Sequence, residues 1–517
     1  MRQRILVVGW DGADWDIVDD LLSRGLLPNL EHLIARGGRG TLLSTVPSHS
    51  WSAWSSFLTG YNPAGHGVWD FVERDPTDPD RRIPVSSTSI RRTTFLDRLS
   101  AAGVEVRAAN IPVTFPAWEI NGRMIGGVAI PPRASFVTPS DFATELRERA
   151  PFPINGLEWM KFERNPDRLI DDARHLVQQR TSSFEVLLEG SWDVAVCVFL
   201  APDRLQHPLG AFLLPTHPLH DQVTDSPMAD ALRGVYRLVD EALGRLVACA
   251  GPDALTIVMS DHGFRPVERQ ANLTAILREL GFAAAGSRND LAHSVRRWAP
   301  TRAITHSRVG YALKHLIRAP AMLDWSRTVA YSAGTSGAIS VNLKGREIHG
   351  TVEPADYDTV RRDVAEALLS YRNADTGDQP VAGVLLREDL PDGDHADLGP
   401  DLLARPAPLW SFRANIDAQT QSSRWPSGDH RQEGILVASQ AAAADLGPWS
   451  ITDMAPTLLA MQGLTASGVD GHPISMIARD TGDLLESDHT GSVEADAVTR
   501  EEQEEVAQHL RDLGYNE

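Results

Sequence analysis

The chain has 517 residues, of which 42% are hydrophobic and 23% are charged, a composition that excludes disordered and fibrous proteins. Because a single core rarely grows beyond roughly 300 residues, this length predicts one large domain with insertions or two to three smaller domains. The net charge of −20 opposes binding to a nucleic-acid polymer, although a bound dication can still create a local site for a small anion.

Apolar runs alternate with helical patterns along most of the chain. In chain order, the segments are a strand at ILVVG (5–9), helices at 15–25 and 28–38, a strand at VEVRAANI (104–111), a helix at 166–189, a strand at DVAVCVFLA (193–201), a helix at about 228–250, and strands at ALTIVMS (254–260) and GILVAS (434–439). Strands that alternate with helices are typical of a mostly parallel sheet covered on both faces. We therefore predict an α/β fold, a three-layer α/β/α sandwich with an inserted helical cap.

The regular alternation stops between residues 265 and 330, where basic helical segments occur without a clear strand. We interpret 265–330 as the inserted cap, with 1–264 and 331–480 forming the catalytic core. Residues 481–517 read as an acidic linker followed by a C-terminal helix, in which Thr499 and Glu502 have the spacing of a capping box.

The N-terminal apolar run ends at Gly9, and charge resumes at Asp11, so the run is too short for a signal peptide or a membrane segment. The two cysteines, Cys197 and Cys249, offer no disulfide framework. We expect a cytoplasmic protein with no membrane partner.

Acidic and histidine side chains follow three of the predicted strands. Asp11 follows the first strand, Asp203 follows the strand 193–201, and Asp261 and His262 follow the strand 254–260. The carboxyl ends of parallel strands meet at one edge of a sheet, where functional residues gather. Asp and His without thiolates are typical of a catalytic zinc or manganese site, whereas a single Asp or His in such a place is more often a helix cap or a structural residue.

His207 stands four residues after Asp203, a spacing that places both side chains on one face of a helical turn. Two metal ions about 4 Å apart would suit phosphoryl transfer, because they can hold both the attacking and the leaving oxygen.

The stretch TLLSTVPSHSWSAWSSFLTG (41–60) holds nine hydroxyl side chains. The spacing of Trp51, Trp54 and Phe57 predicts a helix that begins just after Ser50, which would place Ser50 at the N-cap, where free backbone N–H groups favour an anion. From the residues alone, Ser48, Ser50 and Ser52 remain alternatives for a nucleophile, and an ordinary capping serine is the competing interpretation. We interpret the three aromatic residues as core residues.

Six segments stand in a characteristic order: VVGWDGADW, SHSWSAWSSFLTGYNPAGHGVWDF, APDRLQH, SDHGF, SGDHRQEGIL and ITDMAPTLLAMQGL. In this order they resemble the alkaline phosphatase superfamily, specifically its type I phosphodiesterase / nucleotide pyrophosphatase branch. The resemblance extends from about residue 4 to 475, excluding the predicted cap.

The resemblance implies two divalent metal ions, zinc with manganese as the alternative, and selects Ser50 as nucleophile. It assigns Asp11, Ser50, Asp261 and His262 to one metal and Asp203, His207 and His430 to the other. The implied reaction is attack of Ser50 on phosphorus, followed by hydrolysis of a phosphoseryl intermediate. Asp429 is expected to be a turn residue or a support for a metal ligand.

The sequence departs from the family pattern beside the nucleophile. Ser52 stands where many relatives have Pro, and Ala53 stands where nucleotide phosphodiesterases tend to have Asn. Arg265 and Arg431 are candidates for substrate binding, with a surface salt bridge as the alternative for each. His66 is expected to brace the turn after the nucleophile helix.

We therefore predict a metal-dependent hydrolase that cleaves a phosphodiester, pyrophosphate or phosphonate ester of a small molecule. A phosphomonoesterase or phosphotransferase on the same scaffold is the alternative, and a non-catalytic binding protein is a third hypothesis.

Overall fold

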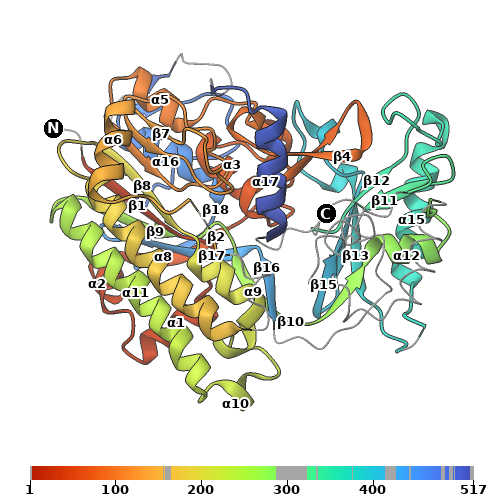
Figure 1. Cartoon of the computed structure of the whole chain (residues 1–517), viewed down its shortest axis with the longest axis horizontal. Helices are drawn as coiled ribbons and strands as arrows, with labels where there is room; N and C mark the ends of the chain where they lie inside the picture. The colour runs from red at the N-terminus through yellow and green to blue at the C-terminus, as the bar shows by residue number, and fades with distance from the viewer. Residues whose placement is uncertain are drawn as a thin grey trace, which may run out of the picture.

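A nine-stranded sheet forms the centre of the protein (Figure 1). The computed structural model describes residues 3–154, 156–157, 165–286, 323–332, 336–374, 376–413, 427–441, 444–478, 484–487, 493 and 495–512. The strand order is β18-β2-β17-β9-β1-β8-β5-β6-β7. The bounds are β1 (Ile5–Trp10), β2 (Gly38–Leu43), β5 (Val106–Ala109), β6 (Gly122–Ile125), β7 (Val137–Thr138), β8 (Val194–Phe199), β9 (Leu255–Met259), β17 (Glu433–Ala438) and β18 (Asp445–Ser450).

The middle of this sheet is parallel, as the sequence predicts. β1 pairs in parallel with both β8 and β9, so that Gly9 lies opposite Val198 on one side and Met259 on the other. All residues of β1, β8 and β9 are buried, which explains their continuous apolar sequences. β17 is antiparallel to both β9 and β2, and β7 is antiparallel to β6, so the sheet is mixed toward its edges.

Helices cover both faces of the sheet, which confirms the three-layer prediction (Figure 1). One face carries α1 (Trp15–Ser23), α2 (Pro28–Arg36), α8 (Pro166–Leu187) and α11 (Pro227–Ala250). The other face carries α3 (Ser50–Thr59), α5 (Phe95–Ala101) and α16 (Met454–Met461). The remaining helices of this part are α4 (Pro63–His66), α6 (Ser140–Arg149), α9 (Ala201–Leu213) and α10 (His220–Val223).

A second hydrophobic core lies beside the first and runs from Ala271 to Phe412. It is built on a four-stranded antiparallel sheet in the order β11-β12-β14-β13. Its elements are α12 (Leu273–Glu279), β11 (Ala330–Ser332), β12 (Ala338–Val341), α15 (Tyr357–Ser370), β13 (Val381–Leu386) and β14 (Leu402–Pro406). We call this body the second subdomain.

The predicted cap and the second subdomain overlap only in part. Residues 287–322, which carry the basic helical segments, lie outside the described residues. The second hydrophobic cluster continues to Phe412, into the range that the sequence analysis assigned to the catalytic core, and it contains a sheet. The boundaries of the domains stay a prediction.

A three-stranded sheet in the order β15-β10-β16 joins the two bodies (Figure 1). β10 (Gly263–Asn272) continues the chain beyond the edge of the large sheet, and β15 (Leu409–Arg413) and β16 (Ser427–Arg431) pair with it. This small sheet therefore links the carboxyl end of β9 to the second subdomain.

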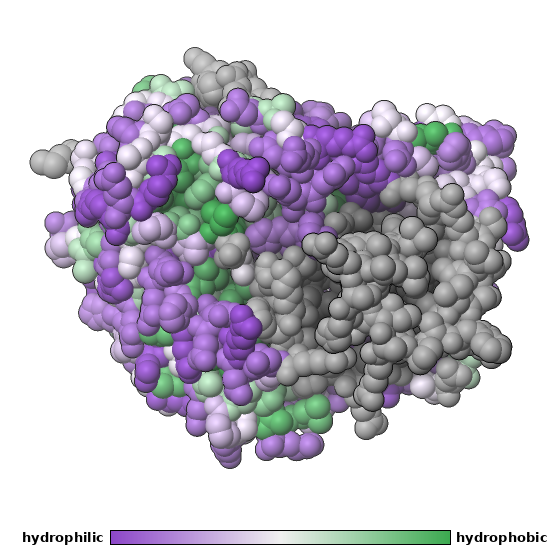
Figure 2. Space-filling view, in the orientation of Figure 1, coloured by the Kyte–Doolittle hydropathy of each residue, from purple (hydrophilic) through white to green (hydrophobic). Residues whose placement is uncertain are grey.

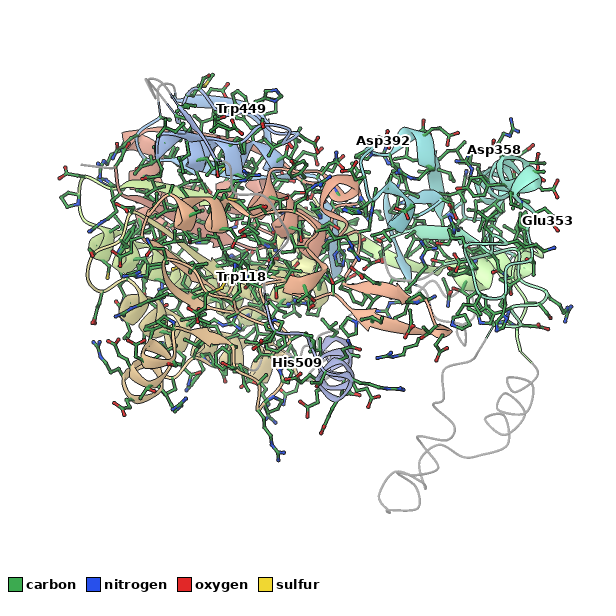
Figure 3. The ribbon with its side chains drawn as sticks, turned by 90° about the horizontal axis from the view of Figure 1, so that it is seen from above. Trp118, Glu353, Asp358, Asp392, Trp449 and His509 are labelled. Atoms are coloured by element: carbon green, nitrogen blue, oxygen red, sulfur yellow. The ribbon has the colours of Figure 1, made fainter. Side chains whose placement is uncertain are left out.

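The hairpin of β3 (Val72–Asp75) and β4 (Asp78–Pro84) reaches from the core toward the second subdomain (Figure 3). Arg74 on this hairpin forms an ion pair with Glu347 of the second subdomain at 2.6 Å. α17 (Arg500–Asp512) lies beside the hairpin, with Val506 and Leu510 buried, and the Thr499–Glu502 capping box is present. Residues 72–84 thus form a hairpin, although their many Pro, Asp and Arg residues are typical of a loop.

The face shown in Figure 2 is mostly hydrophilic, with apolar residues in separate small groups. Among the described residues, no helix combines the length and the apolar character that crossing a bilayer requires.

Candidate active site

The carboxyl edge of the large sheet gathers the acidic residues that follow its strands. Asp11 directly follows β1, Asp261 follows β9 after one residue, and Asp203 lies in the first turn of α9 after β8. Each of these three residues is at most 2% exposed. The sequence predicts that these three residues gather at the carboxyl edge of the sheet, and the structure places them there.

Two glycines allow the chain to pack closely here. A Cβ on Gly9 would lie 2.6 Å from Cη2 of Trp54, so only glycine lets the indole pass over β1. The indole Nε1 of Trp54 then donates a hydrogen bond of 3.0 Å to Oδ2 of Asp11. Gly12 has φ +68°, and its backbone N–H donates to Oδ1 of Asp261 at 3.1 Å.

Ser50 is the first residue of α3 and is buried beside this edge. The N-cap is His49, with extended φ and ψ, so the predicted helix start is wrong by one residue. The Oγ atom of Ser50 lies 3.1 Å from Nε2 of His262. The structure thus brings Ser50 to the residues that the resemblance groups with it.

His430 reaches the site from a distant part of the chain. β16 pairs antiparallel with β10, which places His430 opposite Phe264, two residues beyond His262. The rings of His430 and His262 stack with their centroids 3.7 Å apart. Strand order in the large sheet gives no signal for this residue, because β16 belongs to another sheet.

Asp203 is the centre of the second group of ligand-type side chains. Its Oδ1 atom lies 3.3 Å from Nε2 of His207 and 3.2 Å from Nε2 of His430. The same oxygen lies 4.0 Å from Nε2 of His262. Two sets of side chains therefore have the spacing of metal ligands, and both include Asp203: Asp203, His207 and His430; and Asp11, Asp203 and His262.

Backbone carbonyls fix the orientation of two of the imidazole rings. Nδ1 of His262 lies 3.1 Å from the carbonyl oxygen of Gly263, and Nδ1 of His430 lies 3.1 Å from that of Ser48. A ring that donates its Nδ1–H to a carbonyl has its lone pair on Nε2, and both Nε2 atoms face the carboxylates. This arrangement suits neutral histidine ligands.

Burial controls the charge of the acidic cluster. Burial raises the pKa of Asp11 well above its ordinary value, and the carboxylates of Asp261 and Asp203 raise it further. Burial also raises the pKa of Asp261 to about 7. For Asp203, burial acts in the same direction, but neighbouring imidazoles outweigh it and hold the pKa well below its usual range.

These residues fit divalent cations. Oδ1 of Asp11 and Oδ2 of Asp261 are buried and have no hydrogen-bond partner among the described residues. Buried carboxylates that repel one another need a compensating positive charge, and oxygen and imidazole donors together suit zinc or manganese. The donor set is thus suited to two divalent ions, as the family resemblance implies.

Arg265 and Arg431 are both engaged within the protein. Nη2 of Arg265 donates to Oδ2 of Asp429 at 2.7 Å, and its Nε donates to the carbonyl of His430 at 3.1 Å. Arg431 donates to Oδ1 of Asp14 at 2.6 Å. Both residues line the cavity over the site, but these contacts favour the salt-bridge interpretation of each. The role expected for Asp429, as a turn residue or a support for a metal ligand, stays a prediction.

The other expectations near the nucleophile agree with the structure. Trp51, Trp54 and Phe57 are buried. His66 is fully buried, with Nε2 at 2.9 Å from Oγ of Ser56 and Nδ1 accepting from the backbone N–H of Val68 at 3.1 Å, so it braces the turn.

Buried His49 and partly buried Asp70 form a pair that sequence reasoning missed. Nε2 of His49 lies 3.6 Å from Oδ1 of Asp70, and the ring stacks on Phe71. Burial raises the pKa of Asp70 to about 7. The only signal in the sequence was the position of His49 directly before Ser50.

A cavity of about 720 Å³ opens between the core and the second subdomain, a volume typical of small-molecule sites. Its core side includes His49, Arg204, His207 and His430. Its other side is formed by β13, β14 and β15. The second subdomain therefore forms one wall of the candidate active site.

The sequence profile of the type I phosphodiesterase / nucleotide pyrophosphatase family matches residues 5–432. The chain belongs to this family. The match confirms the resemblance to this branch of the alkaline phosphatase superfamily, and it makes the chain a member of a family of phosphoester hydrolases. No curated protein matches the chain significantly.

Solved structures share the fold of this phosphodiesterase family member. Phosphonoacetate hydrolase from Sinorhizobium meliloti 1021, in complex with phosphonoformate, is 16% identical, with a TM-score of 0.54 over 85% of this chain and 90% of that chain. Murine ectonucleotide pyrophosphatase / phosphodiesterase 5, an inactive variant in complex with AMP, is 15% identical, with a TM-score of 0.51 over 91% and 96%.

Proposed function

We propose that this protein is a two-metal hydrolase that cleaves a phosphodiester, pyrophosphate or phosphonate ester of a small molecule through a phosphoseryl intermediate on Ser50. The observation that carries the proposal is the convergence of the Nε2 atoms of His207, His262 and His430 on Oδ1 of Asp203, within 3.2 to 4.0 Å. The two neighbouring proteins of known structure bind phosphonoformate and AMP, which supports a small phosphorylated ligand.

Asp11, Asp261 and His262, together with Oγ of Ser50, would hold one ion, and Asp203, His207 and His430 would hold the other. Divalent ions at such positions supply positive charge that favours an alkoxide and stabilises the oxygens around phosphorus. Zinc is the ion we expect, with manganese as the alternative. The cytoplasmic location and the absence of nucleic-acid and membrane partners stay predictions.

The chemistry of this chain's residues begins at Ser50. Its hydroxyl gives up its proton to solvent, and its oxygen forms a bond to phosphorus while the bond from phosphorus to the leaving oxygen breaks. The leaving oxygen takes up a proton, and a phosphoserine results. A water molecule then breaks the serine–phosphorus bond and restores the hydroxyl. His262 holds Oγ of Ser50 at 3.1 Å, but its Nδ1 faces a carbonyl and not a carboxylate, which differs from a Ser-His-Asp triad.

A serine series tests the nucleophile. Ser50→Ala should abolish turnover while the protein keeps metal at the Asp203, His207 and His430 group. Ser48→Ala and Ser52→Ala are matched controls. Oγ of Ser48 donates to the carbonyl of Thr45 at 3.2 Å, and Oγ of Ser52 has no hydrogen-bond partner among the described residues. Full turnover by Ser50→Ala would refute the assignment.

Substrate preference separates the proposal from its alternative, a phosphomonoesterase or phosphotransferase. We expect faster turnover of bis-p-nitrophenyl phosphate than of p-nitrophenyl phosphate with added zinc or manganese. A preference for the monoester would favour the alternative. Less than one metal per chain and no activity after metal addition would favour a non-catalytic binding protein.

A further inference from the structure

Arg180 on α8 is a buried cation in an apolar part of the core. It is 4% exposed, and its guanidinium group forms no hydrogen bond or ion pair with any residue that the structure describes. It lies against the ring of Phe152, with Cζ 5.4 Å from the centroid. Burial, with the nearby charge of Arg204, lowers the pKa of Arg180 to about 9. A buried charge without a counter-charge is strongly unfavourable.

Arg204 brings a second buried positive charge to the same place. It is 4% exposed, and its Nε lies 3.7 Å from Oδ2 of Asp203. The other oxygen of Asp203 already faces His207 and His430. Asp203 is thus engaged by Arg204, His207 and His430, and no described carboxylate forms an ion pair with Arg180.

Arg180 and Arg204 line one small cavity of about 10 Å³. Its other described walls are mostly apolar, and they include Val128, Ala129, Leu176 and Leu200. This volume holds one particle of about the size of a water molecule and is too small for phosphate or sulfate. Val128 and Ala129 have φ of 57° and 55°, values that are rare for residues with a Cβ and most of all for a β-branched one.

We infer that this cavity is a binding site for a monatomic anion of chloride size, held between the guanidinium groups of Arg180 and Arg204. The anion supplies the negative charge that the described residues lack, and the cavity excludes polyatomic anions. Arg204 also lines the active-site cavity and contacts Asp203. The anion therefore stabilises the position of an arginine that supports the group of Asp203, His207 and His430. This inference does not depend on the proposed reaction.

Crystals of the full-length protein grown in sodium bromide give the direct test. We expect an anomalous peak between the two guanidinium groups. Either no peak or density that refines only as water would overturn the inference.

Thermal unfolding gives a second test without a variant. At constant ionic strength, chloride in place of gluconate should raise the Tm by about 2 °C, because a ligand that binds only the folded state stabilises it. An unchanged Tm over the range of chloride concentrations contradicts the inference.

Arg180→Met separates an anion site from an ordinary structural arginine. In gluconate, this variant should be at least as stable as the wild type, and chloride should no longer raise its Tm. Arg107→Met is the matched control, because Arg107 is equally buried but donates to Oε1 of Glu105 at 2.7 Å and to the carbonyl of Ser191 at 2.8 Å. That control should lose stability in both salts and keep the chloride response. If Arg180→Met instead behaves like Arg107→Met, Arg180 is structural and the site is not an anion site.

Discussion

Oγ of Ser50 lies 3.1 Å from Nε2 of His262, although 212 residues separate the two in the chain. Ser50 begins a helix on one face of the large sheet, whereas His262 leaves the carboxyl end of β9. The contact joins the candidate nucleophile to the acidic cluster, and the neighbouring side chains that hold this geometry can be tested one at a time.

Trp54 should raise the metal affinity of the proposed site that includes Asp11, because its indole donates a hydrogen bond to that carboxylate. Trp54→Phe removes the 3.0 Å bond from Nε1 and leaves Oδ2 of Asp11 without that donor. We expect a loss of metal affinity of about 10- to 100-fold, as for other residues that support ligands, measured by titration of the metal-free protein.

Trp10→Phe is the control for this change. Trp10 is also fully buried, but its Nε1 has no hydrogen-bond partner among the described residues. The two variants create similar cavities, so equal losses of affinity would show that packing and not the hydrogen bond matters.

His430→Ala should lower the metal content from about two ions to about one per chain. The change removes one nitrogen from the group around Oδ1 of Asp203, while Asp11, Asp261 and His262 remain. Elemental analysis of the folded variant measures the content. His32→Ala, which changes an exposed residue on α2, should keep both ions, and an unaltered content in His430→Ala would remove this residue from the ligand set.

Asp70 should make the metal-free protein less stable at alkaline pH. Burial raises its pKa to about 7 in the folded protein, whereas the ordinary value is 3.8. The folded state therefore binds more protons than the unfolded state between pH 4 and 7, and the contribution of Asp70 to stability rises as the pH falls through about 7.

Asp70→Asn should accordingly raise the free energy of unfolding at pH 8 and weaken its pH dependence, as measured by urea denaturation. The amide keeps the size of the side chain: its oxygen can still accept from the backbone N–H of Phe71, and its NH2 group can donate to the hydroxyl oxygen of Ser336. A loss of stability at pH 8 would instead mean that a charged pair with His49 stabilises the fold.

Arg405 should contribute to the affinity for substrates that carry a second negative charge. It lies on β14, lines the active-site cavity from the second subdomain, and has no ion pair among the described residues. Arg405→Ala should raise the KM for a doubly charged diester about tenfold and change the KM for bis-p-nitrophenyl phosphate little. Arg362→Ala, on the exposed face of α15, serves as control, and an equal change for both substrates would contradict the role.

Five of the nine strands of the large sheet (β1, β5, β8, β9 and β17) and the acidic residues at its carboxyl edge were predictable because their signals are local. Apolar runs such as 254–260 predict buried strands, and the polar residues that follow them, Asp261 and His262, lie where parallel strands end. Ser50 was one of three open alternatives from the residues alone. Its distinguishing contact, to His262, depends on how α3 packs over the sheet, and no periodicity in the stretch 41–60 encodes that packing.

The second subdomain was not predictable in the same way. Its strands are short, and several are only partly buried. In β13 the sequence VAGVLL is apolar although only Val381 is buried, and in β12 buried and half-buried residues alternate, so apolar runs do not mark this sheet as they mark β1. His430 was likewise assigned only through the family resemblance. Its position depends on the antiparallel pairing of β16 with β10, in which Asp429 lies opposite Arg265, 164 positions earlier in the chain.

The pairing of β16 with β10 also sets the order in which the site can form during synthesis. Asp11, Ser50, Asp203 and His262 all leave the ribosome well before His430, and β17, which lies between β9 and β2, follows β16 directly. A nascent chain that ends before this point lacks both β17, the strand that connects β9 to β2 in the large sheet, and one of the histidines around Asp203. The protein therefore becomes able to assemble its candidate catalytic centre only after more than four-fifths of the chain has been made.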